Sequence, residues 1–125
     1  YVEYAYAKQN NLAFALVKNK DGQFPAPKNE AFQAAAANAD WAAAPGFGII
    51  LNNQSGAQAW PITSATFILI RRDADAAKNA AALKFFDWAY SSGDKIAADL
   101  DYVALPANVK TQIRQTWANE LKFTH

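Results

Sequence analysis

The sequence predicts an α/β fold, and three observations carry that prediction. The run WPITSATFILI at 60–70 is apolar without alternation from Ala65 onward, which is typical of a strand covered on both faces of a parallel sheet. Residues 76–91 follow it with apolar side chains at helical spacing. The 125 residues suffice for one small core. Since one such strand cannot form a parallel sheet by itself, the chain reads as a portion of a larger α/β protein.

The N-terminal residues carry weaker signals of extended structure. Alternating aromatic residues at 1–7 favour either a strand end or the entry to a helix. The apolar run LAFALV at 12–17 predicts a short strand. Asp21 and Gly22 mark a turn, because glycine tolerates positive φ, and we expect a hairpin or flap there.

Two helices are expected on either side of the apolar strand. The first covers about 29–43, with Asn29 as its cap, because an Asn side chain can accept a hydrogen bond from the free backbone N–H groups of a first turn. The second covers 76–91, capped by Asp73 or Asp75.

The C-terminal residues predict two further helices. Asp94 is suited to cap a short helix through Leu100. Pro106 suits the first position of the last helix, because its missing N–H has no partner there anyway. A spacing of four places one buried stripe along that helix, formed by Val109, Ile113, Trp117 and Leu121.

Composition excludes several kinds of chemistry. Cysteine is absent, so disulfides, thiol nucleophiles and zinc–cysteine sites are impossible. The single histidine is His125 at the last position, which argues against histidine-based metal sites and Ser-His catalysis. The net charge is +1, so no strong field attracts nucleic acid. We therefore expect no catalytic residue, no metal, no cofactor and no nucleic-acid partner, and we do not expect an enzyme.

Hydroxyl side chains gather near the start of the predicted strand. Thr63, Ser64 and Thr66 lie where α/β proteins often expose ligand-binding groups. Thr63 and Ser64 are therefore weak candidates for lining a ligand cleft. The alternative is that these hydroxyls satisfy nearby backbone groups, and on general grounds that reading is favoured.

Charged residues offer further candidates, each with a plainer reading. Arg71 and Arg72 could grip an anion through their fork-shaped donors, or lie solvated at a strand end. Lys18 and Lys20 could do the same, but they flank a turn, and a solvated hairpin is favoured. The carboxylate pairs Asp73/Asp75 and Asp99/Asp101 could act as acid and base, but a spacing of two does not place them on one helix face, so capping is the better reading.

Several blocks of the sequence resemble one protein family. AWPITSATFILI (59–70), LKFFDWAY (83–90) and DLDYVALP (99–106) resemble the C-terminal part of the phosphate-binding protein of the bacterial phosphate ABC importer. YVEYAYAKQNNLA (1–13) is similar to the same family, and NADW (38–41) matches more loosely. The blocks occur in one order at family-like spacing, which makes the resemblance specific.

The resemblance implies the C-terminal portion of a two-lobed periplasmic-binding-protein (type II) fold, with phosphate held between the lobes. Residues 1–58 would belong to the second lobe, and residues 59–125 would return to the first. The chain would cross between lobes near 59–64. That crossing implies a hinge, at Ala59, Trp60, Pro61 and Ile62.

The resemblance also limits what this chain can do alone. Family members are more than twice as long, and the arginine and SGT signature that contacts phosphate is not present here; Ser55-Gly56-Ala57 only superficially resembles it. No residue of this chain is therefore assigned to phosphate. The implied location is the periplasm, and the implied partners are phosphate, bound only together with the missing N-terminal part, and the membrane permease of the importer. The alternative function is that of a fragment that associates with itself or complements another chain.

Overall fold

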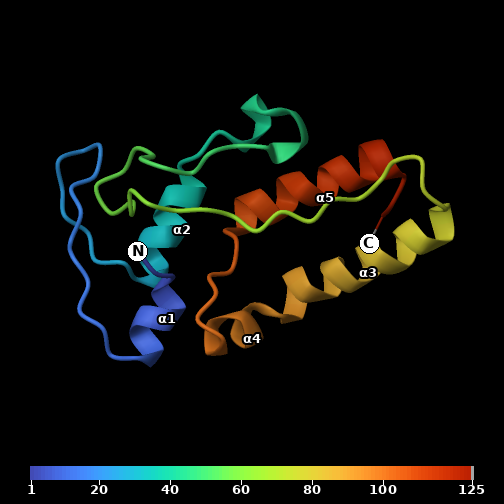
Figure 1. Cartoon of the computed structure of the whole chain (residues 1–125). Coiled ribbons are helices and arrows are strands. Elements are labelled where there is room, and N and C mark those ends of the chain that lie inside the picture. The colour runs from blue at the N-terminus through green and yellow to red at the C-terminus, as the bar shows by residue number, and fades with distance from the viewer. Residues whose placement is uncertain (125) are drawn as a thin grey trace.

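The computed structural model describes residues 1–124, and helices are its only regular elements. Figure 1 shows α1 and α2 at one end, α3 and α5 side by side at the other, and an extended green-yellow segment running between the two ends. No helix in the described part of the chain is long and apolar enough to span a membrane. The elements in chain order are α1 (Tyr4–Gln9), α2 (Asn29–Ala37), η1 (Trp41–Ala43), η2 (Pro45–Phe47), α3 (Ala76–Ser92), α4 (Asp94–Asp99) and α5 (Ala107–Leu121).

The strands that the α/β prediction requires do not form within residues 1–124. Residues 12–17 and 60–70 contain neither helix nor strand. Within the described chain, no amide or carbonyl of residues 62–70 takes part in a backbone–backbone hydrogen bond. A strand is defined by its paired neighbour, and here no neighbouring segment is in register to supply one. The α/β fold that the sequence pattern predicts is therefore not confirmed.

The α2 helix is shorter than predicted at its C-terminal end. It ends at Ala37, and the expected continuation to residue 43 is wrong. The cause is tertiary: the chain turns so that Trp41 is buried, and its indole N–H donates to the Ala36 carbonyl oxygen at 2.7 Å. Asn29 is the first helical residue and not the cap, which is Lys28, and no side chain caps this end.

The α3 helix agrees with its predicted bounds to within one residue. Asp75 caps it, and its side chain accepts from the Lys78 amide at 3.0 Å. The helix is apolar on more than one side, since Leu83 is buried while Phe85 and Trp88 are about half exposed. A helix that is apolar all round is normally covered on all sides, so the outer face of α3 lacks a covering element in residues 1–124.

The helices after α3 begin one residue away from their expected positions. Asp94 is the first residue of α4, and Gly93 occupies the cap position. Pro106 caps α5, which begins at Ala107. Of the predicted α5 stripe, Val109 is fully buried and the other three residues are half-buried.

Polar groups and one aromatic stack hold α5 against α3 and α4. The Lys110 ammonium donates to both Asp94 carboxylate oxygens at 2.6 and 2.7 Å and to the Tyr90 carbonyl at 2.9 Å. Arg114 donates to Asp87 Oδ1 at 2.7 Å. The rings of Tyr90 and Trp117 stack with centroids 5.6 Å apart. Because Lys110 is itself buried, removing its carboxylate partner would leave an uncompensated charge.

The main buried cluster joins the first half of the chain to α5. Its members come from the end of α2, the segment that follows it and the start of α5. They are Ala36, Ala39, Trp41, Leu51 and Val109, with Phe47, Ile49, Ala65, Leu105 and Ile113 packed around them. The N-terminal half of α5 therefore completes a core that residues 36–51 begin.

We predict that the α3–α5 packing weakens at high pH through Tyr90. Burial raises the pKa of the Tyr90 phenol above its ordinary value of about 10. Because the folded state favours the neutral phenol, this contribution to stability is complete below about pH 10 and is lost as the pH rises through the folded-state pKa. Urea unfolding at pH 9 and pH 11 should show a larger loss of unfolding free energy in the native chain than in Tyr90→Phe, which keeps the ring stack. Equal losses would contradict the prediction.

Candidate functional site

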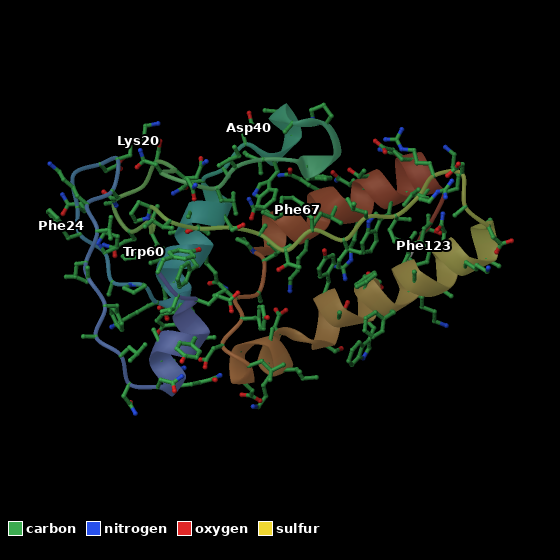
Figure 2. All side chains as sticks on the ribbon, in the orientation of Figure 1. Lys20, Phe24, Asp40, Trp60, Phe67 and Phe123 are labelled. Carbon is green, nitrogen blue, oxygen red and sulfur yellow. The ribbon has the colours of Figure 1, made fainter. Side chains whose placement is uncertain are left out.

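The segment that leaves the first half of the chain is anchored by backbone hydrogen bonds. Ala59 is fully buried, and its amide donates to the Gly56 carbonyl at 2.9 Å. The Trp60 amide donates to the Ala31 carbonyl of α2 at 3.0 Å, and the Pro61 carbonyl accepts from Asn53 at 2.8 Å. Figure 2 shows Trp60 beside α2 and Phe67 further along the same segment, near α5. Three of the four predicted hinge residues are therefore held against the first half.

Ile62 differs from the other predicted hinge residues. Its side chain is 49% exposed, and its backbone forms no backbone–backbone hydrogen bond within residues 1–124. Backbone–backbone hydrogen bonds to the first half thus end at Pro61, although the Thr63 side chain is still buried and bonded to the Trp60 carbonyl. The hinge itself remains a prediction.

A buried amide side chain fixes the loop that precedes this segment. Asn19 Nδ2 lies 3.1, 3.0 and 3.2 Å from the carbonyl oxygens of Gly56, Ala57 and Ala59. Asn19 Oδ1 accepts from the Gln23 amide at 2.9 Å, across a turn in which Gly22 has φ +81°. The predicted turn at Asp21-Gly22 is confirmed. It positions the Asn19 side chain, whose bonds to the three carbonyls we call the Asn19 clamp.

Two more side chains hold the same loop. The Asp21 carboxylate accepts from the Gly56 amide at 3.0 Å. Asn38, just after α2, donates to the Ser55 carbonyl at 2.8 Å. Ser55-Gly56-Ala57 is therefore bound through its backbone by side chains of this chain. Asn19 was not among the residues expected from the sequence. The signal for it is an Asn two residues before Asp-Gly, a pattern in which Asn side chains often bond to turn backbone.

The predicted cleft residues lie on a large apolar groove. The groove has a volume of about 690 Å³ and lies between residues 63–70, α3 and α5. Thr63 is buried and its hydroxyl donates to the Trp60 carbonyl at 2.9 Å, while Ser64 and Thr66 are exposed. Apolar side chains dominate the lining, among them Phe67, Leu83, Phe86, Ile113 and Trp117. Such a lining suits apolar protein segments better than a small anion, which needs hydrogen-bond donors.

The basic candidates are divided between ion pairs and solvent. Arg71 donates to the Asp73 carboxylate at 3.0 and 2.8 Å, and Arg72 pairs with Glu120 of α5. The Arg71 guanidinium lowers the pKa of the Asp73 carboxyl. Lys18 and Lys20 are exposed, and Lys20 extends away from the molecule (Figure 2).

The carboxylates do not converge on a common site. Asp75 caps α3, while Asp99 pairs with Lys95 at 2.7 Å and Asp101 pairs with Lys8. Among residues 1–124, no three His, Asp or Glu side chains gather where they could hold a metal ion. His125 lies outside the described residues.

Comparison with known proteins shows extensive similarity to one group. No family model matches the sequence. The phosphate-binding proteins PstS of Haemophilus influenzae and Pasteurella multocida are each 50% identical to this chain over 98% of its length. That of Xylella fastidiosa is 46% identical over 98% of the chain. The chain spans 37%, 36% and 34% of these proteins respectively, or about a third of their length.

We predict that Gly56→Ala loosens the anchored loop more than Gly46→Ala does. Both glycines have positive φ, +123° and +63°. A Cβ at Gly56 would lie 2.3 Å from Asn38 Nδ2, whereas nothing lies within 4 Å of a Cβ at Gly46. Gly46→Ala should therefore cost only the strain of the left-handed helical region, about 1–2 kcal/mol. Gly56→Ala should cost more, because φ +123° lies outside that region, where strain is about 1–3 kcal/mol, and because the Asn38 hydrogen bond, about 1 kcal/mol, is also lost.

Urea unfolding of both variants tests this prediction. The double variant Asn38→Ala/Gly56→Ala is the matched control, because it removes the clash and should destabilise the chain by less than the sum of the two single changes. Equal effects of the two glycine substitutions, or strict additivity in the double variant, would contradict the prediction.

Proposed function

We propose that this chain is a structural portion of a phosphate receptor of an ABC importer. The reason is that 98% of its length is homologous to a segment that makes up about a third of the length of each phosphate-binding protein. The observation that carries the proposal is the 46–50% identity to three proteins of that name. Such a receptor binds its ligand and does no chemistry on it. Phosphate would be delivered in the periplasm to the membrane permease of the importer.

In this proposal, the hydrogen-bond donors that hold phosphate lie outside this chain. A dehydrated phosphate needs several converging hydrogen-bond donors. In residues 1–124, Arg71, Arg72, Arg114 and Lys110 already pair with carboxylates, and the groove beside residues 63–70 is apolar. Phosphate would therefore be bound only when the remaining part of the protein contributes its donors.

The proposed lobes are residues 1–58 and 59–125, joined by a crossing near 59–64. The anchoring of Ala59, Trp60 and Pro61 to α2 and its neighbouring loops supports a crossing within 59–64 that leaves the first half after Pro61. The unpaired, apolar segment 64–70 supports a role as a strand of the other lobe, since its backbone needs partners on both edges. Closure of the two lobes around phosphate would then bend the chain at this crossing.

A chimaera tests the proposed function. The Haemophilus influenzae protein, with its matching 37% replaced by this sequence, should bind phosphate in a calorimetric titration, and the isolated 125-residue chain should show no measurable binding. The unaltered Haemophilus protein is the positive control. Micromolar affinity in the isolated chain, or no binding by a folded chimaera, would refute the proposal.

Hydrogen exchange of the same two proteins tests the proposed strand. The amides of residues 64–70 should exchange rapidly in the isolated chain and slowly in the chimaera, where strands of the other part can pair with them. The Trp60 amide serves as an internal control, because it is bonded to Ala31 within this chain and should be protected in both. Fast exchange of 64–70 in a folded chimaera would overturn the strand assignment.

A further inference from the structure

The α5 helix contacts both halves of the chain, and its two contacts differ in kind. One side packs on α3 and α4, and the other packs on residues 36–51. If the halves are lobes that move relative to each other, α5 must release one of these contacts. A role for α5 in lobe movement thus rests on the proposed function, whereas its two contacts are observed independently of that function.

The contact with α3 and α4 is made of specific polar bonds. Arg114 donates to the Asp87 carboxylate, to the Asp87 carbonyl at 3.3 Å and to the Ser91 hydroxyl at 2.8 Å, and both charged partners are largely buried. Lys110 is 8% exposed and depends on the Asp94 carboxylate. Pulling α5 away from α3 would strand buried charges, which is strongly unfavourable.

The contact with residues 36–51 is mostly apolar. On the α5 side only Val109 is fully buried, with Leu105 and Ile113 half-buried around it. Trp41 donates its indole N–H to Ala36 within its own half, so separation would not break that bond. The polar links between this half and residues 101–105 are a 3.3 Å bond from the Gln33 side-chain amide to the Ala104 carbonyl and the Lys8–Asp101 pair, in which the Lys8 side chain is 57% exposed and the Asp101 side chain 12%. Because Lys8 is open to solvent, this pair contributes less than the buried bonds of Lys110 and Arg114.

Beside this second contact, one buried polar atom lacks a hydrogen-bond partner. The side-chain oxygen of Gln112 on α5 is buried and has no hydrogen-bond partner. It lies beside a gap of about 430 Å³ between α5 and the η1–η2 segment, lined also by Trp41 and Phe47. A buried, unpartnered carbonyl oxygen favours any state in which water reaches it.

We propose that the contact of Val109, Leu105 and Ile113 with Trp41 and Leu51 is a latch that opens while α5 stays on α3. Opening separates residues 1–58 from the α3–α5 unit, hydrates Gln112 and exposes one face of Trp41. The extended segment after Pro61 supplies the connection about which the two parts move. The latch thus sets how readily the proposed lobes separate.

Distance measurements on this chain test the latch without phosphate. The chain has no cysteine, so Lys20→Cys/Lys84→Cys places one nitroxide label in each half, at two exposed positions. Pulsed EPR should show a longer-distance population that Val109→Ala increases about tenfold, the factor expected for losing two buried methyl-sized groups. Gln112→Leu should decrease that population, because it removes the unpartnered oxygen.

Fluorotryptophan NMR distinguishes latch opening from unfolding. In Val109→Ala the Trp41 signal should become solvent-exposed while the Trp117 signal, which reports the stack on Tyr90, stays unchanged. Lys78→Ala, at an exposed position of α3, is the matched control and should leave distances and both signals as in the native chain. Parallel exposure of Trp41 and Trp117, or unchanged distances in both latch variants, would overturn the proposal.

The two proposals can fail separately. A chimaera that does not bind phosphate would leave the distance results intact, since these are measured on the isolated chain. Unchanged distances with a phosphate-binding chimaera would remove the latch and keep the proposed function.

Discussion

Every amide and carbonyl of an extended segment needs a hydrogen-bond partner, and residues 62–70 have no backbone partner within residues 1–124. This constraint accounts for the other unusual features of the structure. Leu69 is 92% exposed although it lies in the most apolar run of the sequence. The groove beside it is large and lined by rings and aliphatic side chains. The outer face of α3 carries exposed Phe85 and Trp88. All three features are what a sheet-forming segment and its covering helices show when neighbouring strands are absent.

Order in the rest of the chain comes from a few side chains that bind distant backbone. Asn19 fixes the loop at 56–59, Lys110 joins α5 to the end of α3, and Trp41 turns the chain back onto α2. Between these fixed parts, the first half and the α3–α5 unit meet through mostly apolar contacts. This difference between the contacts is what the proposed division into two lobes would require.

The sequence predicted best what depends on neighbouring residues. Asp75 caps α3 and the helix follows its predicted bounds, because capping and helical periodicity are local. The turn at Asp21-Gly22 is local for the same reason. The strands at 12–17 and 60–70 were not confirmed, because strand formation depends on partners far along the chain. The overlong α2 reflects the tertiary burial of Trp41, and no local pattern encodes it. At the candidate site, Thr63 could be named from the sequence, whereas the hinge positions came from the family resemblance and stay a prediction. The sequence near Asn19 indicates a bond to its own turn, but not its three carbonyl partners, which lie about 40 residues away.

The core that α5 completes has a consequence for biosynthesis. Trp41 and Leu51 leave the ribosome about 70 and 60 residues before Val109, the fully buried side chain that covers them. At about 5–20 residues per second, these apolar surfaces stay open for several seconds during translation. Apolar surface exposed in this way during synthesis is the kind that chaperones cover. The core of the first half is therefore completed only after Val109 has been synthesised.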